Sequence, residues 1–117
     1  MKRFSLTIAA LLIASASSSS VQAHAQLDHA NPPVGSTVRS LPGQITLYFT
    51  ESVEPKFSGA EVRNSAGARV DAGHSASGNT LSISVKGLSP GDYTVSWHVL
   101  SVDTHKTQGS FSFHVGK

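Results

Sequence analysis

Six histidines are the residues of this sequence best suited to chemistry, and no cysteine accompanies them. The absence of cysteine excludes a disulfide framework, a thiolate metal site and a cysteine nucleophile. An imidazole can bind a transition metal, transfer a proton or lie in solvent. The informative histidines are therefore those with a second ligand close by in the chain. The six are His24, His29, His74, His98, His105 and His114.

His105 has such a neighbour in Asp103. Both lie in a polar segment, residues 101–109, between two strongly apolar segments. Residues two apart in extended backbone project to the same side, so the carboxylate and the imidazole are expected to be presented together. By itself the pair is open to two interpretations, a structural hydrogen bond within a loop or half of a metal site.

The start of the chain has the features of an export signal. Lys2 and Arg3 are followed by a short apolar run, residues 4–16, and by small residues up to position 23. The apolar run is too short to span a membrane. We expect residues 1–23 to be a cleaved Sec-type signal peptide and residues 24–117 to be the exported domain.

Two cleavage sites fit the rule for small residues, one after Ala23 and one after Ala25. The first leaves His24 as the mature N-terminus, and the second removes this histidine. The sequence rules alone do not separate the two sites.

Cleavage after Ala23 would make His24 a chelating residue. Its free α-amine and its ring Nδ1 would close a six-membered ring around one ion. With the His105 imidazole and the Asp103 carboxylate, the set has three nitrogens and one oxygen, which suits tetragonal Cu(II). Zn(II) could use the same ligands but ranks below Cu(II), and Cu(I) prefers sulfur. The only methionine is Met1, so the mature chain has no thioether ligand.

The other histidines have simpler interpretations. His98 and His114 fall on the polar faces of alternating segments, so we expect them to be solvated. His74 falls in a Gly/Ser-rich segment that we expect to be a turn. Spacing alone gives neither His74 nor His29 a partner, and whether either forms a weaker second site stays open.

Short alternating segments position these residues. The clearest strand patterns are at residues 44–50, 80–85, 93–99 and 110–115, with weaker ones at 26–30, 60–64 and 69–73. Proline and glycine separate them, and no segment has a sustained helical period. About seven strands predict an all-β, Greek-key, immunoglobulin-like sandwich. Ser89-Pro90-Gly91-Asp92-Tyr93 predicts a tyrosine corner.

The charge balance gives no reason to expect a nucleic-acid partner. Loss of residues 1–23 removes Lys2 and Arg3 from the nine basic residues and leaves a formally neutral chain. No basic stripe then remains to attract nucleic acid. The sequence also has neither a glycine-rich phosphate loop nor a serine placed on a nucleophile elbow.

Several short motifs are spread over the whole mature chain: His24-Ala25, Asn31-Pro32-Pro33-x-Gly35, Leu47-Tyr48-Phe49-Thr50-Glu51, Leu88-x-Pro90-Gly91-x-Tyr93-x-Val95-x-Trp97 and Ser101-x-Asp103-x-His105-x-x-x-Gly109. Together these motifs resemble the CopC family of periplasmic copper-resistance proteins. The last third of the chain carries the most specific part of the resemblance.

The resemblance implies a Cu(II) site formed by His24, Asp103 and His105. It also implies a glutamate beside the site that orients the amine, matching Glu51, with Glu54 as a nearby competitor. Because the methionines of the family's Cu(I) loop are missing, it implies a Cu(II)-only member. It favours cleavage after Ala23.

The resemblance further implies a monomeric, non-enzymatic periplasmic protein for copper sequestration, homeostasis or delivery. Its partner would be an inner-membrane copper importer of the CopD type. Two alternatives come from other classes. One is a copper oxidase with a histidine brace, although a carboxylate would then fill a position that O2 needs. The other is an immunoglobulin-like interaction module without metal, which cleavage after Ala25 would favour.

Overall fold

The computed structural model describes residues 25–40 and 43–117. His24 and the expected signal peptide lie outside the described residues. No helix in the described ranges is both long and apolar enough to cross a membrane. Apart from one 3-10 turn, η1 (Pro55–Phe57), the elements are strands: β1 (Leu27–Asn31), β2 (Thr37–Val38), β3 (Gln44–Phe49), β4 (Gly59–Asn64), β5 (Asp71–Ser77), β6 (Thr80–Val85), β7 (Gly91–Leu100) and β8 (Lys106–Val115).

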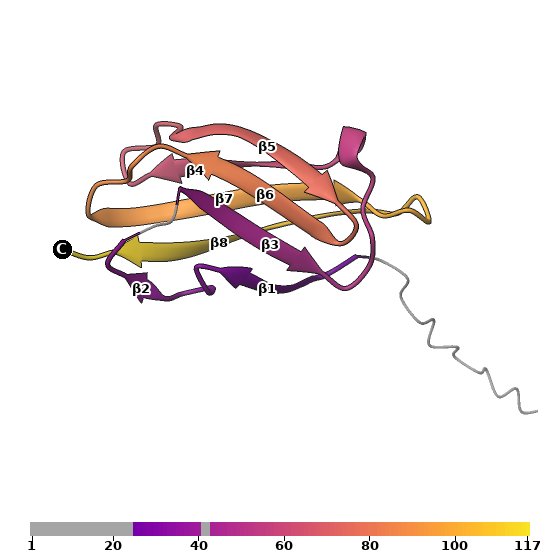
Figure 1. Cartoon of the computed structure of the whole chain (residues 1–117), viewed down its shortest axis with the longest axis horizontal. Helices are drawn as coiled ribbons and strands as arrows, with labels where there is room; N and C mark the ends of the chain where they lie inside the picture. Colours follow the sequence, from indigo (N-terminus) through magenta and orange to yellow (C-terminus); the bar gives the residue numbers. More distant parts are fainter. Residues whose placement is uncertain (1–24, 41–42) are drawn as a thin grey trace, which may run out of the picture.

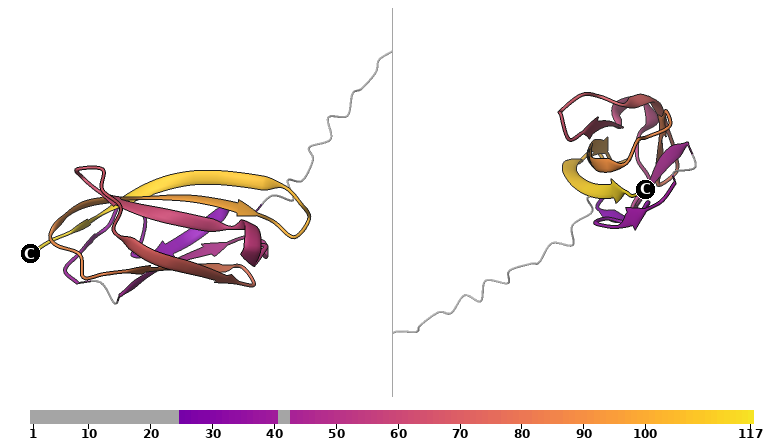
Figure 2. Two further views of the ribbon diagram at one scale, coloured as in Figure 1. Left: turned by 90° about the horizontal axis from the view of Figure 1, so that it is seen from above. Right: turned by 90° about the vertical axis from the view of Figure 1, so that its left-hand side faces the viewer.

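The strands form two four-stranded sheets, in the orders β1-β3-β6-β5 and β2-β8-β7-β4. The sheets face each other as two layers (Figures 1 and 2). The prediction of an all-β sandwich is confirmed. The structure adds β2, which pairs parallel with β8 over only two residues. So short a segment cannot show alternation, which is why the sequence pattern missed it.

The core consists of the apolar residues that alternate along the inner face of each sheet. In β3, for example, Ile45, Leu47 and Phe49 are all at most 1% exposed. Burying a side chain of this size contributes about 1.5–3 kcal/mol to stability. The inner faces of β6, β7 and β8 are filled in the same way by Leu81, Ile83, Val85, Tyr93, Val95, Trp97, Val99, Phe111, Phe113 and Val115.

The expected tyrosine corner is present at the start of β7. The hydroxyl of Tyr93 donates a hydrogen bond of 2.6 Å to the backbone carbonyl of Ser89. This bond ties the loop before β7 to the strand and fixes the direction in which β7 enters its sheet.

Two sequence predictions need correction. A strand was expected at residues 69–73 and a turn at His74, but β5 runs over Asp71–Ser77 and includes this histidine. The strand lies at a sheet edge, is rich in Gly, Ser and Ala, and has an irregularity between Asp71 and Gly73. It therefore has no apolar alternation to reveal it. The polar loop also ends early, because β8 begins at Lys106.

Asp71 holds β5 against β4 of the opposite sheet. Its carboxylate accepts a 2.9 Å hydrogen bond from the backbone N–H of Val62 and a 2.7 Å bond from Arg69. The hydrogen bond from Arg69 lowers the pKa of the Asp71 carboxyl, and the bond from Val62 adds to this against the opposing effect of burial. The two sheets are thereby joined along this edge.

Gly109 is the position in β8 where a side chain has no room. It pairs with Trp97 across the β7–β8 ladder. A Cβ there would lie 2.6 Å from Cζ2 and 3.0 Å from Cε2 of Trp97. The indole cannot easily move, because it is buried and packs edge-on against Phe49 with ring centroids 5.1 Å apart. The glycine that ends the last motif is therefore a packing requirement of the core.

The variant Gly109→Ala is expected to lower the free energy of unfolding by about 1–3 kcal/mol, because it overpacks this site. Denaturant unfolding of the apo protein measures the change. Gly87→Ala is the control, since a Cβ at that glycine meets nothing within 4 Å. An unfolding midpoint for Gly109→Ala equal to that of the control would contradict the packing argument.

Candidate metal centre

Asp103 and His105 meet in the tight turn that joins β7 to β8. Their side chains are 3.3 Å apart, measured from His105 Nδ1 to Asp103 Oδ1. The backbone between them is not extended, because Thr104 has a φ of 73°. A left-handed conformation is unusual for a β-branched residue and is typical of functional turns. The predicted pairing is present, but the turn produces it, not the extended backbone that the spacing suggested.

Ser101 stabilises this turn by hydrogen bonds. The residue is fully buried. Its hydroxyl hydrogen-bonds the carboxylate of Asp103 and accepts a 3.2 Å bond from the backbone N–H of His105. Its own backbone N–H donates to the carbonyl of His105 at 2.9 Å. One buried side chain thus positions both candidate ligands.

The same contacts determine the charge of Asp103. The hydrogen bond from Ser101 lowers the pKa of the carboxyl below its usual value, and the neighbouring His105 lowers it further, while desolvation acts in the opposite direction. Asp103 is therefore an ionised oxygen donor at neutral pH. The His105 side chain is 53% exposed, so an ion can approach it from solvent.

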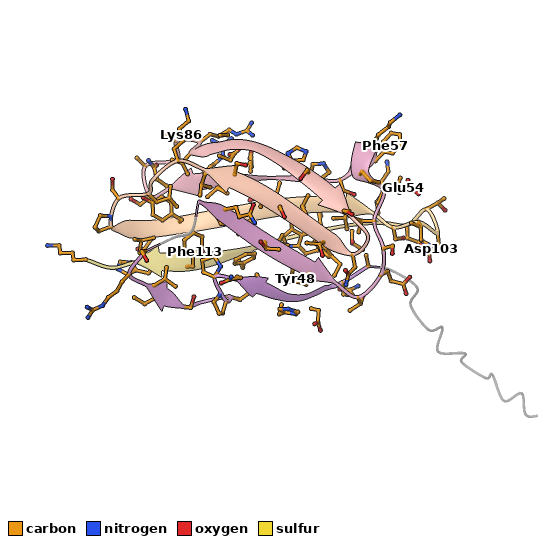
Figure 3. All side chains as sticks on the ribbon, in the orientation of Figure 1. Tyr48, Glu54, Phe57, Lys86, Asp103 and Phe113 are labelled. Carbon is orange, nitrogen blue, oxygen red and sulfur yellow. The ribbon has the colours of Figure 1, made fainter. Side chains whose placement is uncertain are left out.

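The turn is fastened to the segment that follows β3. The backbone N–H of Glu54 donates to the carbonyl of Leu100 at 2.8 Å, and that of Val102 donates to Ser52 at 3.1 Å. Figure 3 shows Glu54 and Asp103 at the same end of the sandwich. Within the described residues, the carboxylates of Glu51 and Glu54 have no hydrogen-bond or ion-pair partner.

The described chain enters the fold at this same end. Ala25 is fully buried, and its carbonyl accepts a 2.8 Å hydrogen bond from the hydroxyl of Thr107. Gln26 and Thr50 exchange two bonds, both of 2.9 Å. In Figure 1 the start of β1 and the β7–β8 turn lie at one end, and the C-terminus lies at the other. Ala25 thus contacts the residue of β8 that lies two positions after His105. It also lies next to the segment that carries Glu51.

The described part of the chain supplies only part of a metal centre. Across residues 25–40 and 43–117, no group of three or more His, Asp or Glu residues could hold a metal ion. Asp103 and His105 are two suitable donors, one oxygen and one nitrogen, so the predicted three-residue site would take its third residue from outside the described ranges. His24, the third predicted ligand, is among the residues that the structure does not describe.

Two other histidines have carboxylate partners of their own. His29 Nδ1 lies 2.7 Å from Oδ2 of Asp28, and its ring stacks on Tyr48 with centroids 4.3 Å apart. His114 Nδ1 lies 2.7 Å from Oδ1 of Asp92, at the far end of β8. Both histidines are exposed. Neither lies in the β7–β8 turn.

Ser101 was not singled out as functional by the sequence, although it opens the last motif. We expect Ser101→Ala to weaken metal binding by about 10- to 100-fold, as loss of groups that orient ligands usually does. The reason is that Asp103 and the backbone of His105 both lose their common hydrogen-bonding partner. Competition titration with Cu(II) measures the effect. Ser110→Ala, an exposed serine of β8, is the control, and equal affinities for the two variants would contradict the role of Ser101.

Comparison with known proteins shows which family this chain resembles. The CopC domain matches residues 27–116. Protein YobA of Escherichia coli K12 is 38% identical over 111 residues, which cover 91% of this chain and 90% of YobA. Copper resistance protein C of Xanthomonas campestris pv. juglandis is 37% identical over 119 residues, 93% of each chain. The crystal structure of PcoC, a methionine-rich copper resistance protein from E. coli, matches with a TM-score of 0.71 and 32% identity, covering 80% of this chain and 99% of PcoC.

The fold and the site define a small β-sandwich protein with an Asp–His pair in the turn at one end. The particular family follows from the comparisons. The chain belongs to the CopC family of copper resistance proteins. The resemblance predicted from the motifs is confirmed, as is the prediction of a copper-binding protein that is not an enzyme.

Proposed function

We propose that the exported protein binds one Cu(II) ion at the end of the sandwich where the β7–β8 turn lies. The ligands are the α-amine and imidazole of His24, the carboxylate of Asp103 and the imidazole of His105. The observation that carries this proposal is the contact between Thr107 and Ala25, which brings the first described residue beside the strand that follows His105. Consecutive Cα atoms are about 3.8 Å apart, and we therefore propose His24 as the residue that joins the pair.

The oxidation state follows from the donors that the chain possesses. The sequence has no cysteine, and its one methionine is Met1. Imidazole, amine and carboxylate ligands suit Cu(II), whereas Cu(I) prefers sulfur. The matched structure PcoC is described as methionine-rich, and this chain lacks that property. We therefore propose a Cu(II) site without a methionine-rich Cu(I) site.

Glu51 is the proposed partner of the His24 amine. It directly follows Thr50, whose backbone and hydroxyl bind Gln26. A carboxylate here would orient the amine and compensate part of the positive charge of the ion. Glu54 lies three residues further on, and its backbone is bonded to β7.

The cellular role follows from the export signal and the family. We propose that residues 1–23 are removed, that residues 24–117 act as a monomer in the periplasm, and that the protein sequesters copper or delivers it. The partner proposed for delivery is an inner-membrane copper importer of the CopD type.

Two measurements on the secreted protein test this function. The intact mass of the secreted chain should correspond to a start at His24. Titration with Cu(II) should then show a first equivalent that binds tightly and depends on His105. A mass that corresponds to a start at Gln26, or tight binding that survives His105→Ala, would overturn the proposed site.

A further inference from the structure

Among the described residues, two histidines outside the proposed Cu(II) site differ from the other histidines in their lack of a hydrogen-bond or ion-pair partner. His29, His105 and His114 each lie within hydrogen-bonding or ion-pair distance of an aspartate. In the described ranges, by contrast, neither His74 nor His98 makes a hydrogen bond or an ion pair. Their ring nitrogens are therefore available to an external ligand.

These two imidazoles converge over Gly59. His98 in β7 is the direct cross-strand partner of this glycine in β4. His74 reaches the same point from β5 of the other sheet. A Cβ built on Gly59 would lie 2.8 Å from Nε2 of His74 and 3.2 Å from Cε1 of His98. Because Cε1 is bonded to both ring nitrogens, each nitrogen of His98 is one bond away from the ring atom that lies nearest to this position.

The fold holds the two strands in this arrangement. The bonds from Val62 and Arg69 to Asp71 keep the β5 edge beside β4. His74 lies three residues after Asp71 in the same strand, so its side chain can cross the open edge between the sheets. The missing side chain at Gly59 leaves the space that both rings occupy.

The surroundings are open and polar. His74 and His98 are exposed and line one shallow pocket together with Glu61, Ser96 and Gln108. The carboxylate of Glu61 is engaged by the guanidinium of Arg63, with Arg69 also nearby. An ion here would therefore be held by two imidazoles and completed by water.

We propose that His74 and His98 form a second, weaker site for a divalent transition-metal ion. Two imidazole nitrogens bind one ion when each can come to about 2.0–2.1 Å from it. Among the common divalent ions, nitrogen ligands favour Cu(II) most strongly. Both ligands lie in the described sandwich, so the site does not depend on where the signal peptide is cleaved. It would let the protein hold a further ion when copper is in excess.

Stoichiometric titration of the mature protein with Cu(II) alone tests the site. We expect two equivalents, with the second bound more weakly. His74→Ala and His98→Ala should each weaken the second equivalent at least about tenfold and leave the first unchanged. His114→Ala, whose ring has its own aspartate, is the matched control and should change neither.

Two outcomes would overturn this second site. One is a wild-type protein that binds a single equivalent, and the other is a second equivalent that is unchanged in the His74→Ala/His98→Ala protein. Failure of the proposal for the first site would be seen separately, as tight Cu(II) binding that does not depend on His105.

Gly59→Ala is the sharpest variant, since it removes no ligand. Its methyl group would occupy the point where the rings meet, and the atoms it displaces are at the far end of the His74 side chain, so the fold should remain. We expect the second equivalent to weaken at least about tenfold, with the unfolding midpoint close to that of Gly87→Ala. Zn(II) titration followed by NMR should shift the ring signals of His74 and His98 together in wild type. Unchanged affinity in Gly59→Ala would contradict the convergence of these rings on one ion.

Discussion

Replacing His24 with alanine in the mature protein is expected to reduce Cu(II) affinity at least about a hundredfold, equivalent to about 2.7 kcal/mol. The variant retains the α-amine, Asp103 and His105, but it loses the imidazole that closes the six-membered chelate ring. The fold then fixes only two donors, Asp103 and His105. Ser101 holds both of them in place independently of the N-terminus. Competition titration against a chelator of known affinity measures the change.

Two further proteins make this prediction specific. Acetylation of the α-amine of His24 retains the imidazole but converts the amine nitrogen to an amide, so it should weaken binding by a similar factor. His114→Ala is the matched control, because His114 lies at the far end of β8 and pairs with Asp92. If His24→Ala bound Cu(II) as tightly as His114→Ala, the N-terminal chelate would not exist.

The second large effect is release of copper in mild acid. Between pH 7 and pH 5, the apparent affinity of the first site is expected to fall by about 10⁴- to 10⁵-fold. Protons compete with a metal ion for amine and imidazole nitrogens, because an unperturbed α-amine has a pKa of about 8 and unperturbed imidazole a pKa of about 6.5. A potentiometric or fluorescent competition titration at several pH values measures the fall. A change of less than about tenfold would mean that the amine and imidazoles are not the ligands.

Asp103 has a different part in this pH dependence. Its folded-state pKa is lowered, chiefly by the hydrogen bond from Ser101. A carboxyl with a lowered pKa is ionised at both pH 7 and pH 5, and its contribution to stability is lost only as the pH falls through the folded-state value. The loss of affinity in this window is therefore attributed to the nitrogens. Circular dichroism at pH 5 should show an intact sandwich, which separates metal release from unfolding.

The proposed N-terminal chelate depends on which peptide bond is cleaved. Cleavage after Ala23 would expose the amine of His24, whereas cleavage after Ala25 would remove both the proposed chelate and a fully buried alanine. The burial of Ala25 and its bond to Thr107 indicate that this residue belongs to the folded domain. A start at Gln26 would leave Thr107 without this hydrogen-bond partner.

The sequence by itself determined the fold class and the principal strands, because a half-buried strand must alternate apolar and polar residues. It did so for β3, β6, β7 and β8. It failed for β2 and β5, whose short or small-residue segments bury too little to impose that pattern. The pairing of Asp103 with His105 was predictable because only one residue, Thr104, separates them in one loop.

Tertiary structure decided everything that depends on contacts between distant segments. The hydrogen bonds between Ser101 and both ligands form where the chain makes a left-handed turn at Thr104. The glycine at position 109 is explained only by the indole of Trp97 across the ladder. His98 was correctly predicted to be solvated, but its meeting with His74 was invisible in the sequence. The two residues lie in different sheets, and local periodicity carries no information about which edges the packed layers bring together.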